Sequence, residues 1–437
     1  MLLNFKVKNY RSIREEIVLD LEATALNDDK ECFLKYNNNS YLPVLSIYGK
    51  NGGGKSNVIR AFWLAVQFIR NAQRTQHENA EIPVRPFELD DTSRNEPTSF
   101  EFEYVCNDIR YKYGFSATRK EIVSEYLYWK PKGQIKKIFE RDYQTFQFTS
   151  NKDKKMKEMI KNAVAKNQLF FAISCVMNYQ PCIDAMKWFR TQIFFSRDYS
   201  DIGKNILDYG EDKEMLQSIV NIAKIADFGI SDMKFEINNM EIMSLDELPE
   251  FITIEQRQEI KRSLEQFKKS LLSDSENIEG KLQLNELKTT SFHKGIASNG
   301  QEREYPMSLA DESDGTIKLM ARAAAIEEAL KVGGILIIDE IENRLHPLLV
   351  EYIIKRFQYQ KNRTNAQLIF TTHSTHSTDI MNREMLRRDQ YYFVDKDFET
   401  GVTELYSLAD FSPRKDEKIG KAYLVGKYGA IPFIREE

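Results

Sequence analysis

The sequence predicts an α/β protein in which parallel strands carry a binding site for a phosphorylated ligand. Three observations lead to this prediction. A glycine-rich segment, residues 49–56, lies between an apolar run and a helical pattern. Two further apolar runs, residues 335–338 and 367–370, end in polar side chains. Runs of this kind are typical of buried parallel strands, whose carboxyl ends hold ligands in open α/β sheets.

Length and composition are those of an ordinary globular protein that forms more than one unit. The chain has 437 residues, 42% of them hydrophobic and 29% charged, and a formal net charge of −4. This charge argues against a surface that binds nucleic acid everywhere, but it leaves room for a local basic patch. The sequence contains no run of about eighteen apolar residues, so no membrane span is predicted. The N-terminus is too polar for a secretion signal. Four scattered cysteines favour the cytoplasm, namely Cys32, Cys106, Cys175 and Cys182.

The first elements of the chain lead directly to the glycine-rich segment. Residues 3–21 largely alternate apolar and polar side chains, with a break at 9–12, which predicts two strands joined by a turn. Residues 26–40 are polar and predict a loop. The apolar run 44–48 predicts a buried strand, and Val58, Phe62, Ala65, Val66 and Ile69 share one face of the helix that follows the glycines.

The glycine-rich segment fits the phosphate-binding pattern G-x-x-x-x-G-K-[ST]. Glycines let the backbone curl so that successive N–H groups face phosphate oxygens, and the helix adds its positive dipole end. Lys55 reaches the β and γ phosphates, and the Ser56 hydroxyl ligates Mg²⁺. A chance match in a flexible linker is the alternative, but the flanking strand and helix argue against it. The predicted ligand residues are Gly49, Asn51, Gly52, Gly53, Gly54, Lys55, Ser56 and Asn57.

The middle of the chain changes character twice. After an irregular, proline-containing crossing at 73–98, residues 100–148 alternate apolar and polar side chains and predict an antiparallel meander. Residues 151–291 have few glycines and prolines and show helical spacing, as at 215–226, so a mostly helical insertion is expected. A helix over 254–272 is also expected, which is far too short for a long coiled-coil arm.

Two acids end the apolar run 335–338. Asp339 is expected to bind Mg²⁺ directly or through water, and Glu340 to polarise an attacking water. A buried strand that merely ends in surface acids is the alternative explanation.

Two further segments flank these acids. Residues up to 324 predict a helix, and Ser313 or Asp314 is expected to cap its start. Alternatively, Ser313 and Gly315 form a second contact with phosphate. His373, after the run 367–372, is placed to touch a γ-phosphate beside the acids. Alternatively, His373 and His376 form a metal pair with Asp379.

The order of these motifs resembles that of the ATP-binding-cassette class, in the soluble branch that includes DNA-repair and chromosome-maintenance heads and OLD-type ATPases. The resemblance implies an ABC-type P-loop head made of residues 1–150 and 292–437, with the β-meander in its first half and the insertion 151–291 between the halves. In that class two heads sandwich ATP, so Ser313 and Gly315 would complete the site of a second subunit. A homodimer or higher homo-oligomer is therefore implied, with ATP and Mg²⁺ as cofactors.

Within this branch the sequence most resembles the AAA15 ATPases of bacterial abortive-infection and restriction-linked loci, of the AbiL and RloA type. The resemblance implies an antiviral ATPase switch in the cytoplasm that controls a separately encoded nuclease-like or toxin effector. Arg344 departs from the serine that is commoner there, and the region around Pro86 and Phe87 is the candidate glutamine loop. The shared pieces are residues 5–12, 86–89, 311–316, 339–347, 371–374, 386–390, 423–424 and 426–432.

Two alternative functions are open. The chain itself is a nuclease if Arg70 and His77 form the ribonuclease pattern R-x-x-x-x-x-x-H, although a solvated helix end explains them too. Only about 60 residues follow His373, too few for the cutting domain of OLD-type proteins. A repair-type, nucleic-acid-binding ATPase is the other alternative, because a cluster of lysines could bind phosphates. The same cluster could instead be the solvent-exposed face of a helix. The cluster consists of Lys152, Lys154, Lys155, Lys157, Lys161 and Lys166.

Overall fold

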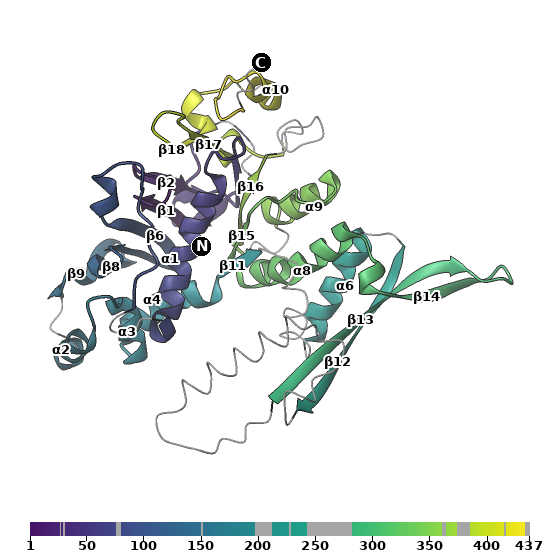
Figure 1. Cartoon of the computed structure of the whole chain (residues 1–437), viewed down its shortest axis with the longest axis horizontal. Helices are drawn as coiled ribbons and strands as arrows, with labels where there is room; N and C mark the ends of the chain where they lie inside the picture. The colour runs from purple at the N-terminus through teal and green to yellow at the C-terminus, as the bar shows by residue number, and fades with distance from the viewer. Residues whose placement is uncertain are drawn as a thin grey trace. The chain divides into compact units, whose positions relative to one another are not determined.

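The structure is a computed structural model, and it describes most of the chain. The described residues are 1–26, 28, 31–75, 80–149, 152–196, 212–226, 229–242, 282–360, 364–373, 385–414 and 417–432. The chain divides into two compact units (Figure 1). The first comprises Met1–Arg197 and Ala325–Glu437, and the second comprises Asp198–Ala324. The predicted domains 1–150, 151–291 and 292–437 have different boundaries, and that division stays a prediction.

A six-stranded sheet of described residues organises the first unit, in the order β11-β15-β16-β5-β17-β18. All neighbours are parallel except β17 and β18, which are antiparallel. The side chains of β5, β15 and β16 are buried throughout, as expected for central strands. The strands are β5 Val44–Tyr48, β11 Ile193–Ser196, β15 Ile335–Ile338, β16 Gln367–Thr372, β17 Tyr391–Lys396 and β18 Thr403–Ser407.

A seven-stranded antiparallel sheet, in the order β10-β9-β8-β7-β6-β1-β2, is the second layer of this unit. It contains the predicted meander, and the predicted N-terminal hairpin joins its edge because β1 pairs with β6. Along β6, Phe100, Phe102 and Tyr104 are buried and the residues between them are half-buried. The strands are β1 Leu2–Lys8, β2 Ile17–Asp20, β6 Thr98–Cys106, β7 Ile109–Ala117, β8 Ile122–Lys132, β9 Gln134–Asp142 and β10 Thr145–Gln147.

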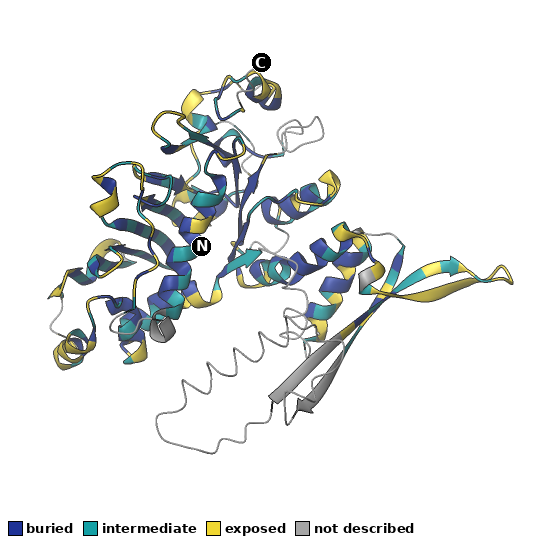
Figure 2. Cartoon of the chain, in the orientation of Figure 1, coloured by how far each residue is buried: buried dark blue, intermediate teal, exposed yellow. Residues whose placement is uncertain are grey.

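Helix α1, Lys55–Thr75, packs between the two sheets. The ring of Phe62 lies 4.8 Å from Phe5 and 5.2 Å from Phe102 on one side, and 6.1 Å from Phe195 of β11 on the other. Gln367 links the sheets as well, since its side chain exchanges two hydrogen bonds with the backbone of Leu2, of 2.6 and 2.9 Å. In Figure 2 these inner surfaces are buried, so the glycine-rich loop is mounted on a rigid core.

Smaller elements complete the first unit. Helix α9, Pro347–Gln358, packs on β16 and β5, and the ring of His346 accepts a hydrogen bond from the backbone of Leu348 at its start. The remaining elements are the hairpin β3 Leu34–Tyr36 with β4 Asn39–Tyr41, the 3-10 turns η1 Ser93–Asn95, η4 Arg388–Gln390 and η5 Leu408–Phe411, and α10 Ile419–Leu424.

Three helices follow the meander and belong to the first unit, although a separate insertion was expected to begin at 151. They are α2 Lys154–Ala163, α3 Phe170–Val176 and α4 Gln180–Thr191. Apolar side chains such as Phe171 and Phe189 pack on the meander, which explains why this segment does not stand apart. Lys157 is buried and lies 5.3 Å from the ring centre of Phe148, so it does not contribute to a basic surface.

A buried carboxylate fastens α3 to the meander. Glu125 of β8 accepts hydrogen bonds from the backbone N–H groups of Phe170 and Phe171, at 2.7 and 2.9 Å. Its partner Arg141 lies 3.5 Å away, and both side chains are completely buried. Burial raises the pKa of Glu125, and the nearby Arg141 acts in the opposite direction.

Replacing Glu125 with alanine is therefore expected to destabilise this region by about 3–5 kcal/mol, because it strands a buried arginine and two backbone donors. Hydrogen exchange of the α3 amides measures the effect. Glu158→Ala is the control, since its half-exposed carboxylate is 3.8 Å from Lys161 and should matter little. Equal exchange in the two variants would contradict the proposed role of Glu125.

The second unit contains helices and a long antiparallel sheet in its described part. Helix α6, Lys213–Ala226, agrees with the expected helical spacing. The sequence analysis did not predict the three-stranded sheet of this unit, which is formed by β12 Ile230–Ile242, β13 Leu282–Ile296 and β14 Glu302–Ser308. The strands were not predicted because long polar residues dominate them. β12 also pairs with β13, which is distant in the sequence. The expected helix 254–272 lies outside the described residues.

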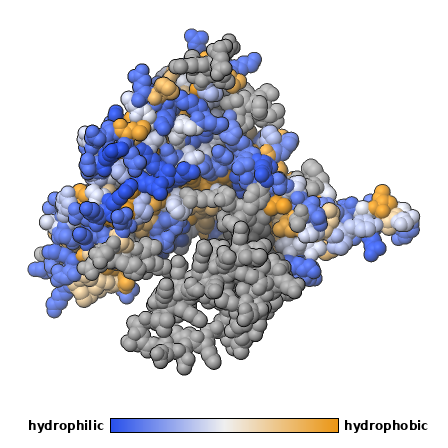
Figure 3. Space-filling view, viewed as in Figure 1, coloured by the Kyte–Doolittle hydropathy of each residue, from blue (hydrophilic) through white to orange (hydrophobic). Residues whose placement is uncertain are grey.

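The second unit ends within a helix. The turn η3, Leu309–Asp311, leads into α8, Asp314–Val332, whose last residues belong to the first unit. Within the described part of the chain, no helix is both long and apolar enough to cross a membrane. In the view of Figure 3, the described surface is mostly hydrophilic, with hydrophobic residues scattered over it.

Candidate functional site

Three neighbouring parallel strands end at the same edge of the six-stranded sheet. β5 lies beside β16, with Tyr48 opposite Thr372, and β16 lies beside β15, with Phe370 opposite Ile338. The glycine-rich loop follows β5, the acids follow β15, and His373 follows β16. Three segments distant in the sequence therefore meet at one place.

The glycines allow the loop to pack closely against β17 and β18. A Cβ atom on Gly49 would lie 2.3 Å from the backbone oxygen of Val394, and one on Gly54 would lie 2.5 Å from Oγ1 of Thr403. Gly54 also has a φ of 113°, in the region that favours glycine. Neither position has room for a side chain, so glycine is required where the loop lies against the two strands.

Lys55 lies inside this curl. Its Nζ donates hydrogen bonds to the carbonyl oxygens of Gly49 and Lys50, at 2.6 and 3.2 Å, and the residue is only 7% exposed. Burial lowers the pKa of Lys55, and the carboxylates of Glu342, Glu340 and Asp339 act against this shift. The structure thus brings a buried cation and three acids to one edge of the sheet.

Thr371, a buried residue of β16, holds the acids in place. Its hydroxyl donates to Oδ1 of Asp339 at 2.5 Å and accepts from the backbone N–H of Glu340 at 2.7 Å. Glu340 has a φ of 52°, which is uncommon for a residue other than glycine and marks a sharp turn. One hydroxyl therefore fixes both the oxygen of Asp339 and the direction of the chain at Glu340.

Glu342 is a site residue that the motif pattern does not predict. Its Oε1 accepts a hydrogen bond from the backbone N–H of His373 at 2.7 Å and lies 2.9 Å from Nδ1 of the same residue. Its Oε2 is buried and has no hydrogen-bond partner among the described residues. Since Nδ1 of His373 is engaged, Nε2 is the ring nitrogen left for another group. A third acid three residues after Asp339 is the sequence signal for this arrangement.

Hydrogen bonds and an ion pair between side chains stabilise the loop. The amide of Asn57 donates to Oγ of Ser12 at 2.7 Å, and Thr403 donates to the same oxygen at 2.8 Å. In the loop itself, Lys50 forms an ion pair of 2.7 Å with Asp395. Asn57 was expected to bind the ligand, whereas its side chain contacts Ser12 here.

The other predicted residues take the following positions. Ser56 is the second residue of α1 and is half-buried, while Asn51 and Gly52 are exposed at the tip of the loop. Ser313 and Gly315 belong to the second unit, at the start of α8. There Oγ of Ser313 accepts from the backbone N–H of Thr316 at 3.1 Å, so the predicted helix cap is confirmed at Ser313.

The alternative sites lie mostly outside the described residues. His77 of the ribonuclease pattern, and His376 and Asp379 of the histidine metal pair, fall there. Among the residues that are described, no group of three His, Cys, Asp or Glu side chains is arranged to hold a metal ion. Arg344 is exposed and has a φ of 60°.

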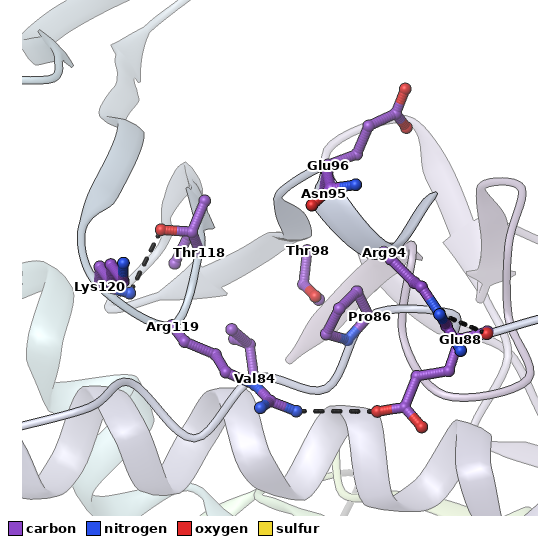
Figure 4. A pocket seen from close by; sticks show the side chains of 11 residues that line it. Val84, Pro86, Glu88, Arg94, Asn95, Glu96, Thr98, Thr118, Arg119 and Lys120 are labelled. Atoms are coloured by element: carbon purple, nitrogen blue, oxygen red, sulfur yellow. Dashed lines mark hydrogen bonds and ion pairs between the residues drawn. The ribbon is translucent and has the colours of Figure 1, made fainter. Parts of the chain in front are cut away.

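A surface cavity of about 630 Å³ lies apart from the loop, where the candidate glutamine loop was expected (Figure 4). Pro86 lines it, and Arg119 reaches Glu88 across it at 3.7 Å. Phe87 itself is buried, and its backbone N–H donates to Asn9. No glutamine occurs in residues 80–98, so this segment offers no glutamine side chain to a ligand.

A strand, glycine-rich loop and helix, with acids at the end of a nearby parallel strand and an antiparallel sheet alongside, define a P-loop protein. The family model described as "AAA domain, putative AbiEii toxin, Type IV TA system" matches residues 44–155 and 175–379. The chain belongs to this family. The family match covers the loop, both acids and His373. No curated protein matches the sequence.

Solved structures with a similar chain trace include chromosome-maintenance and recombination proteins. The SMC head domain from Thermotoga maritima is 11% identical, with 93% of this chain and 98% of that chain covered and a TM-score of 0.36. The recombination mediator protein RecF with ATP is 15% identical, with 93% and 97% covered and a TM-score of 0.37. An Smc head domain bound to the C-terminal domain of ScpA, derived from Pyrococcus furiosus, is 11% identical, with 94% and 97% covered and a TM-score of 0.37.

Proposed function

We propose that this protein binds ATP with Mg²⁺ at the glycine-rich loop and hydrolyses it. The observation that carries the proposal is the position of Lys55 after β5 and of Asp339, Glu340 and Glu342 after β15, at the same edge of the sheet on either side of β16. A buried lysine facing acids is what a site for a metal-bound triphosphate requires, because the cation receives phosphate and the acids receive metal and water.

The chain fits a triphosphate at the loop. The close approach at Gly49 and Gly54 excludes side chains, and Lys55 already lies where the loop curls. In the proposed complex, Lys55 transfers its hydrogen bonds from the loop carbonyls to phosphate oxygens. The backbone N–H groups at the end of the loop would donate to the same phosphates, and the N-terminus of α1 would add its dipole.

Ser56 and Asp339 would hold Mg²⁺, and Glu340 would accept a proton from the attacking water. When bound, Mg²⁺ would supply positive charge to the phosphate oxygens during transfer. Thr371 keeps Oδ1 of Asp339 and the backbone at Glu340 in fixed positions. His373, oriented by Glu342 through Nδ1, would use Nε2 to detect the γ-phosphate.

Replacing Thr371 with valine, which removes this hydroxyl at similar volume, is expected to raise the Mg²⁺ concentration for half-maximal ATP hydrolysis about 10- to 100-fold. Hydrolysis is measured across a Mg²⁺ titration at saturating ATP. Thr371→Ser retains the hydroxyl and should behave nearly as the unmodified protein does. The same Mg²⁺ requirement in valine and serine variants would refute the positioning role.

We further propose that two heads pair around ATP, with Ser313 and Gly315 of one completing the site of the other. The exposure of Ser313 at a capped helix start supports this assignment, because a second chain can reach it. The family description names a putative toxin and a toxin–antitoxin system. Together with the resemblance to AbiL and RloA, it leads us to propose a role in cytoplasmic defence against phage. A separately encoded toxin or nuclease would be the effector, as the resemblance to AbiL and RloA implies.

The direct test is the rate of phosphate release from ATP by the purified chain. We expect release that requires Mg²⁺ and that rises more than linearly with protein concentration, since two heads are needed. Absence of Mg²⁺-dependent hydrolysis at every protein concentration would overturn the proposal, and a strictly linear dependence would overturn the pairing of heads.

A further inference from the structure

A buried acid stands directly before Ser313. Glu312 is 9% exposed, and its side chain is 2% exposed. A carboxylate taken out of water is costly unless hydrogen-bond donors surround it. Ser313, the next residue, is by contrast exposed. The chain therefore turns one polar side chain inward and the next one outward at the start of α8.

Two side chains of β13 provide the donors. The hydroxyl of Ser291 donates to Oε1 of Glu312, and Nε2 of His293 lies 2.7 Å from the same oxygen. Ser291 and His293 are two residues apart on one strand and therefore face the same side of the sheet. Glu312 also bonds through its backbone N–H to the carbonyl of Leu309, at 3.2 Å, which closes the turn η3.

The start of α8 and the base of the hairpin also share a small apolar core. Met320 of α8 packs in one cluster with Val220 and Ala223 of α6 and with Ile230 and Met233 of β12. Helix α8, strand β12 and strand β13 thus hold one another through both apolar and polar contacts. The turn that carries Ser313 is therefore held against β13 by the contacts of Glu312.

The outer part of the hairpin has a different character. Every residue of β14 is exposed, and Figure 2 shows the strand in yellow along its length. Ile296, at the end of β13, is 77% exposed. The hairpin is therefore anchored at its base, where Glu312 lies, and open to solvent farther out.

We propose that Glu312 is a positioning residue, which through Ser291 and His293 fixes the Ser313–Gly315 turn for contact with the nucleotide of a second head. The hairpin formed by β13 and β14 sets the position of that turn. This inference rests on the proposed pairing of heads around ATP. It adds that β13 controls how well the pair forms, without contributing to nucleotide binding by a single head.

The test compares Glu312→Gln with the unmodified protein in two assays. Binding of a fluorescent ATP analogue with Mg²⁺, at protein concentrations below those that pair heads, reports the single head. The protein concentration for half-maximal ATP hydrolysis reports pairing. We expect unchanged binding and a pairing concentration raised about 10-fold, because the charge-assisted hydrogen bonds to Glu312 become weaker neutral ones.

Three further variants separate positioning from general damage. His293→Ala should reproduce the effect of Glu312→Gln, and His293→Gln, which retains a donor near the position of Nε2, should largely restore pairing. Glu304→Gln, an exposed acid on the same hairpin, should change neither assay. Thermal unfolding of each variant checks that the second unit is folded.

The outcomes distinguish this inference from the proposed function. If the unmodified protein hydrolyses ATP and pairs, but Glu312→Gln pairs equally well, the positioning role is wrong and the function stands. Weaker nucleotide binding by the single head of Glu312→Gln would also refute the positioning role. If the unmodified protein neither hydrolyses ATP nor pairs, the proposed function itself fails.

Discussion

Replacing Glu340 with glutamine is expected to lower ATP turnover by about two to four orders of magnitude, the usual contribution of a general base. Glutamine has the same shape but cannot accept the proton of the attacking water. The backbone N–H of Glu340 is held by Thr371, so the amide should occupy the position of the acid. Nucleotide binding should persist, and a long-lived ATP-bound dimer should accumulate.

Light scattering after size-exclusion chromatography with Mg²⁺ and ATP measures this dimer, and phosphate release measures turnover. Glu399→Gln, a change at an exposed acid, is the matched control and should behave as the unmodified protein. Full turnover in Glu340→Gln would show that another residue activates the water. Lost turnover without a gain in dimer would show that hydrolysis does not separate the heads.

Replacing Lys55 with methionine should weaken ATP binding about 10- to 100-fold and reduce hydrolysis still further. A charge-assisted hydrogen bond to phosphate is lost with the ammonium group of Lys55. The positive charge also balances Glu342, Glu340 and Asp339, so without it the acids would repel the triphosphate. Methionine keeps most of the apolar volume of the lysine stem.

Titration with a fluorescent ATP analogue measures the dissociation constant for this variant. Arg60→Met is the control, because Arg60 is an exposed cation on the same helix. Comparable affinity in Lys55→Met and Arg60→Met would place the nucleotide outside the glycine-rich loop. A selective loss in Lys55→Met supports the site proposed here.

Local patterns were sufficient to predict the strands of the site and the fold class. The runs 44–48, 335–338 and 367–372 are apolar because both faces of each strand are buried, and this composition is visible without any partner. The alternation in β6 and β7 similarly reflects a sheet with one face on the core. The α/β class with an antiparallel meander is confirmed.

Pairings between distant segments could not be predicted. β1 joins the meander through pairs such as Phe5 with Phe102, and β11 joins the parallel sheet from within the expected insertion. β12 and β13 are rich in long polar residues, so their composition suggested helices. In each case tertiary contacts decide the outcome, and local propensity carries little information about them.

The site shows the same division between local and distant information. Lys55 and Asp339 belong to patterns whose spacing reflects their chemistry. Thr371 and Glu342, in contrast, matter because β16 lies beside β15, and that neighbourhood is a property of the sheet order. Asn57 belongs to the loop pattern, yet its side chain supports the loop through Ser12.

The central claim is that the ends of β5, β15 and β16 assemble one triphosphate site. The most direct measurement is an experimental structure of the protein with Mg²⁺ and a non-hydrolysable ATP analogue. We predict Lys55 on the terminal phosphates and Mg²⁺ held by Ser56 and Asp339, with Glu340 beside the γ-phosphate. A triphosphate bound elsewhere, or bound at the loop with Asp339 and Glu340 turned away from it, would contradict the account.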